Sequence, residues 1–405
     1  MPLPETTPTY YRKGFGLKAE VHDTLAADYT GRLVDLLRQR EFELTAGSVT
    51  VRLAREFGFC YGVERAVEYA YQTRTKFPER PIFLAGEIIH NPHVNKKLRE
   101  MGITFLRSDG GDFDYSVVGP GDVVILPAFG VTMRDFETLR AKNVVVVDTT
   151  CGSVLNVWKR VDSYARTGLT AVIHGKYYHE ETRATASQVS RYSGGRYLVI
   201  RNMDEARIVC DYIEGRGSRE DFVSRFAHSA SPEFDPDRDL RRVGVANQTT
   251  MLARESLAIG EEIGRALARA HGEDYRAEHF RTFDTICSAT QDRQDAVEAL
   301  LREPLDVMLV IGGYNSSNTI SLAAICGASV RTFHVEDAEC LDVGRGVIRH
   351  RPIGASADIE TPEWLGGIGH VTVGITAGAS TPNNKIGEAV ARVFATRGID
   401  PGDIV

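Results

Sequence analysis

At three places in this chain a short run of β-branched and apolar residues leads to a cysteine, and this pattern constrains the fold more than any other. Residues 144–147 are four valines, and the chain continues through Asp148-Thr149-Thr150 to Cys151. Residues 49–53 lead to Cys60 in the same way, and residues 283–286 lead to Cys287. Such runs predict buried strands, and a thiol just beyond them lies where open α/β sheets carry their chemistry. We therefore expect three α/β units with one cysteine at a strand end of each.

Composition narrows the class of protein. With 405 residues and 42% hydrophobic content, the chain can bury the cores of two or three domains. The formal net charge of −7 and the interspersed basic residues argue against a nucleic-acid partner. The first residues lack an apolar signal core, and no run approaches the roughly 20 apolar residues of a membrane span. We expect a cytoplasmic protein without a membrane partner, in which the six cysteines are thiols.

The order of predicted strands and helices suggests a division into units. Strand and helix patterns alternate from residue 49 onward, which predicts mostly parallel sheets covered on both faces. The residues before that point read as an extension with a helix over 21–41, and residues 336–365 read as loop. We expect an extension at 1–48, α/β domains at 49–148, 149–279 and 280–378, a polar surface excursion at 215–241, and a C-terminal helix and tail at 379–405 that packs back on the first domain.

The spacing of the cysteines excludes some metal sites and leaves others open. No two of the six are spaced Cys-x-x-Cys, which argues against a zinc ribbon or a thioredoxin-like site. Cys210, Cys326 and Cys340 fit ordinary thiols, two on apolar helix stripes and one in an acidic loop. The other three lie far apart along the chain, so a metal site built from them needs tertiary structure. Position alone leaves both metal ligation and ordinary burial open for them.

Several separate motifs, in order from about residue 50 to 395, resemble the 4-hydroxy-3-methylbut-2-enyl diphosphate reductase family, which catalyses the last step of the non-mevalonate isoprenoid pathway. They are Gly58-Phe59-Cys60-Tyr61-Gly62-Val63, Gly86-Glu87-Ile88-Ile89-His90-Asn91-Pro92-His93, Asp148-Thr149-Thr150-Cys151, His174-Gly175-Lys176-Tyr177-Tyr178-His179-Glu180-Glu181-Thr182, Gln248-Thr249-Thr250, Asp284-Thr285-Ile286-Cys287, Asn315-Ser316-Ser317-Asn318 and Ala377-Gly378-Ala379-Ser380.

The resemblance implies a fold, a cofactor and a reaction. The fold is a trefoil of three similar α/β domains around a central [4Fe–4S] cluster held by Cys60, Cys151 and Cys287. Three thiolates leave the fourth iron without a protein ligand, so that the cluster can act as a Lewis acid as well as an electron relay. The substrate is an allylic alcohol diphosphate, which loses its hydroxyl as water after two single-electron transfers. The products are isopentenyl and dimethylallyl diphosphates, and the electron donor is a ferredoxin or flavodoxin.

The resemblance also assigns roles to residues outside the cysteines. Glu181 matches the acid that protonates the leaving hydroxide, and Thr249 matches the residue that positions the hydroxyl. The diphosphate is expected to bind at strand ends that lead into helices, where backbone N–H groups converge. The residues expected to bind it are His90, His179, Ser316, Ser317, Asn318 and Ser380. Read without the resemblance, the same residues also fit helix caps, a solvated glutamate and structural histidines.

Three departures from the common family pattern keep other functions open. Phe129 stands in Ala128-Phe129-Gly130, where many members have histidine. Longer members from photosynthetic lineages, which this chain resembles, also carry phenylalanine there. Gly152 and Asn156 replace the usual proline and lysine after Cys151. One alternative is a paralogue that keeps the cluster and acts on another substrate. The other, from a different class, is a non-catalytic redox or metal-binding module. The sequence does not indicate an oligomeric state.

Overall fold

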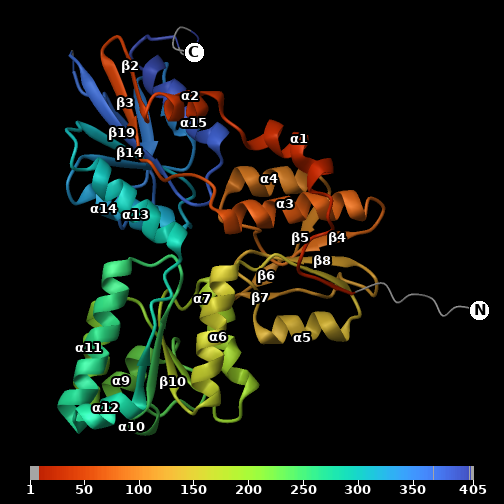
Figure 1. The fold of residues 1–405 in the computed structure, drawn as a ribbon, viewed down its shortest axis with the longest axis vertical. Coiled ribbons are helices and arrows are strands. Elements are labelled where there is room, and N and C mark those ends of the chain that lie inside the picture. Colours follow the sequence, from red (N-terminus) through yellow and green to blue (C-terminus); the bar gives the residue numbers. More distant parts are fainter. Residues whose placement is uncertain (1–8, 368, 401, 403–405) are drawn as a thin grey trace, which may run out of the picture. The chain divides into compact units, whose positions relative to one another are not determined.

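The computed structural model describes residues 9–367, 369–400 and 402 of the chain. The chain divides into two compact units, each built from segments that are distant in sequence (Figure 1). Unit 1 comprises Met1–Phe15, Lys76–Ile88 and Arg99–Cys287, and unit 2 comprises Gly16–Thr75, Ile89–Leu98 and Ser288–Val405. Most of the sheet pairing in both units is parallel, which confirms the predicted α/β class.

The first sheet of unit 1 has five parallel strands. Their order is β1 (Tyr10–Tyr11), β9 (Val145–Asp148), β8 (Val123–Leu126), β4 (Ile82–Leu84) and β5 (Ile103–Phe105). All residues of β8 and β9 are buried, as the continuous valine-rich runs predict for central parallel strands. Helix α5 (Met133–Ala141) begins at a capping box in which Thr132 and Asp135 satisfy each other's backbone N–H groups. The extension contributes β1, so this part of it belongs to the sheet.

The second sheet of unit 1 has four parallel strands and a helical layer on each face. The strand order is β11 (Tyr197–Ile200), β10 (Thr170–His174), β12 (Val243–Asn247) and β13 (Phe280–Thr282). Alternate residues of β10 face different cores: Val172 packs with α8 (Met203–Ile213) and α11 (Ala253–His271), whereas Ala171 and Ile173 pack with α6 (Gly152–Arg166). In Figure 1, α6 and α11 flank β10 on opposite sides.

The segment 215–241 was predicted as a polar excursion outside the core, and that prediction is wrong. It forms α9 (Arg219–Phe226) and α10 (Pro236–Asp239). Phe222 and Phe226 are each 2% exposed and pack into the same core as α8 and α11. The charged residues around them, Arg219, Glu220, Asp221 and Arg225, concealed two aromatic side chains spaced one helical turn apart.

The sheet of unit 2 has five strands, four of them parallel. The order is β15 (Thr332–Val335), β14 (Val307–Ile311), β19 (Val371–Ala377), β3 (Val49–Leu53) and β2 (Glu43–Ala46), with β2 antiparallel to β3. Helices α2 (Arg32–Gln39) and α15 (Asn383–Ala395) cover one face, and α13 (Ser288–Leu300) and α14 (Ser317–Gly327) cover the other. Strand β3 was expected beside β4 and β8 in the domain 49–148. It pairs instead with β19, more than 300 residues later.

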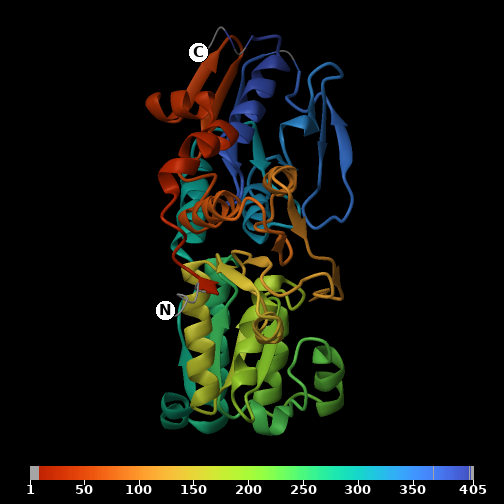
Figure 2. The same cartoon turned by 90° about the vertical axis from the view of Figure 1, so that its right-hand side faces the viewer.

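Residues 336–365 were predicted as loop, and that prediction is also wrong. They contain a small antiparallel sheet of β16 (Leu341–Asp342), β17 (Val347–His350) and β18 (Ile359–Pro362). Figure 2 shows these strands in light blue next to α15, which contacts β16. The helix predicted over 21–41 is two helices, α1 (Lys18–Tyr29) and α2. Within the described residues no helix combines the length and the apolar character that crossing a lipid bilayer demands.

Candidate functional site

Cys60, Cys151 and Cys287 occupy the same kind of position, at the start of a helix beyond a parallel strand. Cys151 is the N-cap of α6, Cys60 directly precedes α3 (Tyr61–Lys76), and Cys287 directly precedes α13. All three are partly exposed thiols, whereas Cys210, Cys326 and Cys340 are buried. Burial raises the pKa of Cys210 and Cys326 to about 12, so these two thiols stay protonated. Each of the other three lies beside the N-terminus of a helix, where backbone N–H groups are free of helical partners.

The backbone around the three cysteines repeats as well. In each case the cysteine N–H donates to the carbonyl of the second residue beyond a strand of the parallel sheet. Cys151 donates to Ala128 after β8 at 2.9 Å, Cys60 to Ala379 after β19 at 3.1 Å, and Cys287 to Thr249 after β12 at 3.2 Å. Each thiol is therefore held at the carboxyl edge of a sheet by the same local construction. The strand before Cys287 is β13, Phe280–Thr282, so the prediction of a buried strand at residues 283–286 is wrong.

The loop before Cys60 is fixed by a glycine and a buried arginine. Gly58 has φ +70, and a Cβ there would lie 3.0 Å from Asn383 Oδ1 and 3.2 Å from the carbonyl of Thr381. Arg293 of α13 is 3% exposed and donates from Nη2 to the Gly58 carbonyl at 2.6 Å. The chain enters α13 directly from Cys287, so the helix that starts at one proposed ligand also holds the loop of another.

Glu181, Thr249 and Cys287 form one connected group in unit 1. Glu181 lies in the first turn of α7 (Glu180–Ala186) and is 2% exposed. Its carboxylate accepts the Thr249 backbone N–H at 2.6 Å and the Thr249 hydroxyl at 3.0 Å. The carbonyl of Thr249 in turn accepts the N–H of Cys287. The sequence predicted a catalytic role for each of these two residues, and the structure places Glu181 and Thr249 in direct contact.

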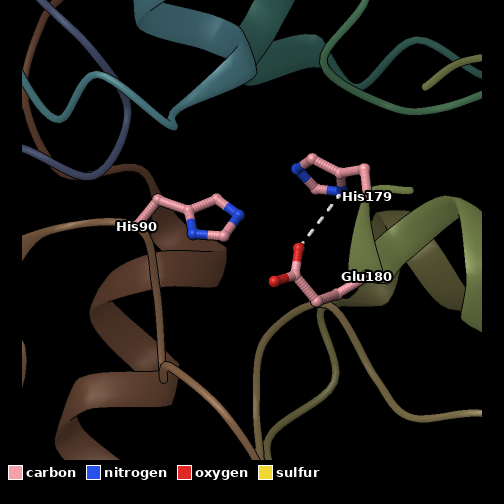
Figure 3. A group of neighbouring side chains, drawn as sticks. All are labelled: His90, His179 and Glu180. Carbon is pink, nitrogen blue, oxygen red and sulfur yellow. Dashed lines mark ion pairs between the residues drawn. The ribbon is translucent and has the colours of Figure 1, made fainter. Parts of the chain in front are cut away.

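His179 connects this group to Cys151. It is the N-cap of α7, and its Nδ1 accepts the backbone N–H of Glu181 at 3.1 Å, so the neutral ring carries its proton on Nε2. Figure 3 shows the Glu180 carboxylate turned toward His179, with 3.9 Å between Glu180 Oε2 and Nδ1. The ring of Phe129 meets His179 edge to face at 5.5 Å between centroids. Phe129 directly follows Ala128, whose carbonyl accepts the N–H of Cys151. A continuous series of contacts therefore connects Cys151, through His179 and Glu181, to Cys287 within unit 1.

The proposed diphosphate residues of unit 2 also form one group. His90 Nδ1 lies 3.2 Å from Nδ2 of Asn315, whose amide orients the ring. The Ser380 hydroxyl donates to the His90 carbonyl at 3.1 Å. Asn318 Oδ1 accepts the N–H of Ala379 at 2.9 Å, and Ala379 is the residue whose carbonyl holds Cys60. The predicted residues of this unit are therefore joined to its cysteine.

Ser316 and Ser317 lie at the N-terminus of α14, in a space that only small residues allow. Ser316 caps the helix, accepting the N–H of Thr319 at 3.4 Å, and both serines are buried. Gly312 has φ +145, and a Cβ there would lie 2.7 Å from the hydroxyls of both Thr319 and Thr381. Hydroxyls, an amide and the positive end of a helix dipole converge here, which is the composition of an anion cradle.

The donor set fits an iron–sulfur cluster. Thiol sulfur is the usual ligand of such clusters; each of the three cysteines lies at a helix N-terminus and is held by a backbone hydrogen bond while it stays partly exposed. Unit 1 carries Cys151, Cys287, Glu181, Thr249 and His179, and unit 2 carries Cys60, His90, Ser316, Ser317, Asn318 and Ser380. Each unit thus contributes one connected part of the predicted set.

Sequence reasoning assigned no role to three supporting residues. Gln248 accepts the backbone N–H of Lys176 and the hydroxyl of Thr182, both at 3.1 Å, and so ties the loop before α7 to the end of β12. Asn315 orients His90, and Arg293 holds the loop of Cys60. Gln248 and Asn315 lie inside the quoted motifs. Arg293 had one usable signal, because a charged residue on the buried face of a helix needs a partner.

The departures after Cys151 cause no crowding. A Cβ on Gly152 would have no heavy atom within 4 Å, and Asn156 is exposed on α6. Gly152 is the first residue of α6, where proline fits as well as glycine does.

Comparisons with known proteins agree with this arrangement. The family model described as "LytB protein" matches residues 51–394. A 4-hydroxy-3-methylbut-2-enyl diphosphate reductase of Gloeobacter violaceus is 49% identical over 395 residues, covering 96% of this chain and 93% of that protein. The enzyme of the same name from Thermosynechococcus vestitus is 46% identical over 391 residues, covering 96% and 95%.

Two solved structures are also similar. The first is described as that of (E)-4-hydroxy-3-methyl-but-2-enyl diphosphate reductase, the terminal enzyme of the non-mevalonate pathway. It has a TM-score of 0.51 and 29% identity, covering 86% of this chain and 99% of that one. The second, the E-1-hydroxy-2-methyl-but-2-enyl-4-diphosphate reductase of Plasmodium falciparum, has a TM-score of 0.62 and 21% identity, covering 85% and 87%. At that identity it shows the fold alone.

Proposed function

The chain belongs to the LytB family, and on that premise we propose that it reduces 4-hydroxy-3-methylbut-2-enyl diphosphate to isopentenyl diphosphate and dimethylallyl diphosphate. The observation that supports this best is the connected group of Glu181, Thr249 and Cys287, which joins a buried proton donor to a proposed cluster ligand. A purely structural metal site has no need of a buried carboxylate that is hydrogen-bonded to the residue holding a proposed ligand cysteine.

Cys60, Cys151 and Cys287 are the proposed ligands of a [4Fe–4S] cluster. When bound, such a cluster supplies single electrons and one iron without a protein ligand, which acts as a Lewis acid. The repeated backbone hydrogen bond at each cysteine supports one shared role for the three thiols. The protein's contribution is to fix the direction of each sulfur and to leave one position open to the substrate alcohol.

Glu181 and Thr249 are proposed to hold and deliver the proton that the departing hydroxide needs. Both are buried, so the proton is not exchanged freely with bulk water. When Glu181 is ionised, its two oxygens accept the N–H and O–H of Thr249. When it is protonated, its O–H donates to the Thr249 hydroxyl, which can then donate to the substrate oxygen. The backbone hydrogen bond keeps the carboxyl in place in both states.

The diphosphate is proposed to bind to neutral donors. Ser316, Ser317 and Asn318 at the N-terminus of α14 supply hydroxyls, an amide and free backbone N–H groups, and Ser380 and His90 lie in the same group of contacts. His179 adds an Nε2 proton from unit 1. Phe129 cannot donate a hydrogen bond, so its proposed role is to hold the His179 ring through their edge-to-face contact.

The reaction consumes two electrons, so the protein needs a reductant. We propose a small electron carrier, a ferredoxin or flavodoxin, that meets the protein in the cytoplasm.

Anaerobic purification followed by metal analysis and turnover tests the proposal. The protein should contain about four irons per chain and convert the allylic diphosphate with a reduced viologen as electron source. Cys60→Ser, Cys151→Ser and Cys287→Ser should each lose iron and turnover, while the matched control Cys210→Ser keeps both. An iron-loaded protein that leaves this substrate unchanged would favour the paralogue. Zinc in place of iron, with no turnover, would favour the non-catalytic module.

A further inference from the structure

Unit 1 contains a cavity of about 510 Å³ that the proposed reaction does not use. It lies at the amino ends of two parallel strands, where Thr170 begins β10 and Arg242 precedes β12. The catalytic group lies beyond the carboxyl ends of the same sheet. Five residues of β10 separate the two ends, a length of roughly 15 Å, so the cavity and the proposed catalytic group are distinct sites.

Arginines dominate the lining of this cavity. Arg196, Arg238, Arg241 and Arg242 face it, and Asp239 is the single acidic residue among the described lining residues. The volume falls in the range of small-molecule sites, and guanidinium groups match phosphate oxygens in a bidentate fashion. The lining therefore carries a surplus of positive charge in a chain whose net charge is −7.

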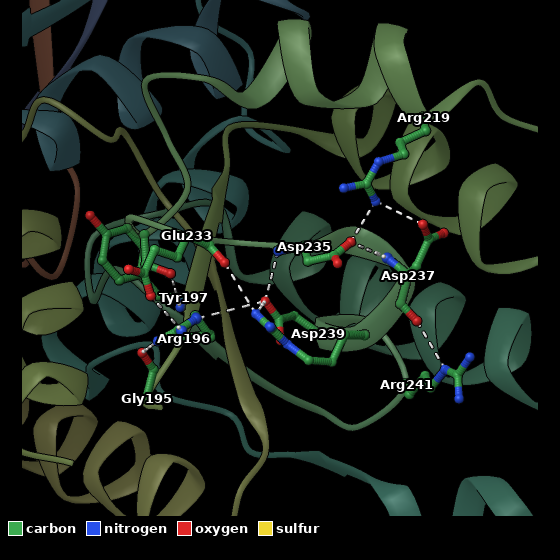
Figure 4. Close-up of polar contacts among 11 residues, drawn as sticks. Gly195, Arg196, Tyr197, Arg219, Glu233, Asp235, Asp237, Asp239 and Arg241 are labelled. Atoms are coloured by element: carbon green, nitrogen blue, oxygen red, sulfur yellow. Dashed lines mark hydrogen bonds and ion pairs between the residues drawn. The ribbon is translucent and has the colours of Figure 1, made fainter. Parts of the chain in front are cut away.

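The excursion 215–241 builds one wall of the cavity and is fixed to the sheet. The N–H of Ser231 donates to the Tyr197 carbonyl at 3.0 Å, and the N–H of Val199 donates to the Ser229 carbonyl at 2.7 Å. Figure 4 shows Arg219 bridging Asp235 and Asp237, which closes the base of the excursion. The backbone that carries Arg238 and Arg241 is therefore fixed by hydrogen bonds and ion pairs.

Two of the arginines are held in place by carboxylates. Asp239 is 8% exposed and accepts from Arg238 at 2.6 and 2.8 Å. Arg196 donates to Glu233 at 3.3 Å, and its Nε lies 3.8 Å from Asp239 Oδ2 (Figure 4). These contacts leave Arg196 and Arg238 oriented, with most of their charge balanced by neighbours.

The other two arginines have no carboxylate partner among the described residues. Arg241 donates from Nε to the backbone carbonyl of Asp237 at 2.9 Å (Figure 4). Arg242 lies against Gly168, with Nη1 at 3.4 Å from the position of a Cβ there. Both side chains are exposed, and no carboxylate of the described residues pairs with either one, so the two guanidinium groups are open to an anion that enters from solvent.

The surroundings favour a small anion over a long one. Glu233 and Asp237 are exposed carboxylates next to the arginines, and they would repel a nucleic-acid backbone that runs across the surface. The carbonyls at the C-terminal end of α6, on the cavity wall, are occupied by the N–H groups of Thr167, Gly168 and Leu169. An anion of two or three charges that enters the cavity would match the charge of Arg241 and Arg242.

We propose that this cavity binds the diphosphate group of a small molecule, as a second site independent of the catalytic one. The inference goes beyond the proposed function, because it uses none of the residues assigned to catalysis and holds whatever the reaction is. Inorganic diphosphate and a diphosphate ester share the chemistry that the arginines recognise.

Equilibrium dialysis of the full chain with radiolabelled inorganic diphosphate tests the site. The double variant Arg241→Gln, Arg242→Gln should bind one equivalent fewer than the wild-type protein, its affinity at this cavity falling about 100-fold or more. The matched control Arg207→Gln removes an exposed arginine of α8 that pairs with Asp204, and it should bind as many equivalents as the wild type. Thermal unfolding checks that both variants are folded.

Competition then identifies the source of the diphosphate. Displacement of the equivalent that the double variant lacks by ADP or by dimethylallyl diphosphate indicates an ester as ligand, and its displacement by inorganic diphosphate alone indicates the inorganic ion. Either result supports the site. A double variant that binds as many equivalents as the wild type, or equal displacement by sulfate, would overturn the proposal.

Discussion

The hydroxyl of Tyr10 donates to the carboxylate of Asp148, 138 residues further along the chain. Tyr10 belongs to β1, which extends the sheet beside β9, and Asp148 is the last residue of β9. Asp148 is 5% exposed, and its other oxygen accepts the N–H of Thr150 at 2.9 Å, directly before Cys151. The N-terminal extension thus braces the turn that presents a proposed cluster ligand.

Tyr10→Phe removes the hydrogen bond to Asp148 and should lower the stability of the fold. Loss of one hydrogen bond to a buried carboxylate is expected to lower the free energy of unfolding by about 1 to 3 kcal/mol, measured by urea titration. Tyr11→Phe is the matched control, because the contacts of Tyr11 are made by its ring, which packs on Phe15 and Phe77. Equal stability of the two variants would show that the Tyr10 hydroxyl does not brace Asp148.

Glu181→Gln should abolish most turnover without loss of iron. The glutamine can keep a hydrogen bond from the Thr249 N–H, so the fold is preserved, but it cannot deliver a proton. We expect kcat to fall about 100-fold or more with little change in KM.

The neighbouring Glu180→Gln serves as the control for that experiment. Its side chain is 46% exposed and its carboxylate is turned toward His179, at 3.9 Å, so kcat should stay within about threefold of wild type. Anaerobic steady-state assays measure both variants. An active Glu181→Gln enzyme would remove Glu181 from the proton path.

Gly152→Ala should stabilise the protein. The backbone at Gly152 is helical, a Cβ there meets no heavy atom within 4 Å, and alanine reduces the freedom of the unfolded chain. The expected gain is about 0.5 to 1 kcal/mol in the free energy of unfolding, with unchanged iron content. A loss of iron in this variant would show that the glycine serves the cluster directly.

Stability should fall as the pH drops from about 6.5 toward 4. Burial lowers the pKa of His174 and of His334 to about 4, so the folded protein resists a proton that the unfolded chain accepts. Above pH 6.5 both states hold neutral rings and these histidines contribute no pH dependence. Between pH 6.5, the pKa in the unfolded chain, and about pH 4, the pKa in the folded protein, each histidine lowers the free energy of unfolding by up to about 1.4 kcal/mol per pH unit.

His334→Gln tests this window. The amide can still donate to the Gly312 carbonyl, which His334 Nε2 contacts at 2.9 Å, but it does not titrate. Urea unfolding at several pH values should show a shallower decline below pH 6.5 than in wild type. His22, 70% exposed on α1, supplies the control variant His22→Gln, whose profile should match the wild type. Identical profiles for all three proteins would contradict the assignment.

Local patterns predicted most elements well. The strands β3 and β9 lie where the apolar runs at residues 49–53 and 144–147 predicted them, within one residue. Non-local pairing was not predictable in this way: β3 reads as an ordinary first strand, and only tertiary structure shows that it pairs with β19. The strands β16 to β18 are short and carry exposed charged residues such as Arg349 and Glu360, so their pattern resembles a loop.

The site was predictable as a set of residue types and not as a geometry. Motif resemblance picked out Glu181 and Thr249, but the bond between residues 68 positions apart depends on how α7 and β12 meet. The repeated cysteine junction was visible in sequence as a strand followed by a thiol. The backbone hydrogen bond that the three cysteines share was not visible, because each cysteine bonds to a residue after the neighbouring strand, and that residue lies at a different distance along the chain in each case.

The central claim is that three thiols hold one cluster and leave a single iron open to the substrate. Mössbauer spectroscopy of iron-57 protein tests it most directly. The account predicts three irons of similar environment and one distinct iron, whose signal alone shifts when the allylic diphosphate is added. Four equivalent irons that the substrate leaves unchanged would contradict it.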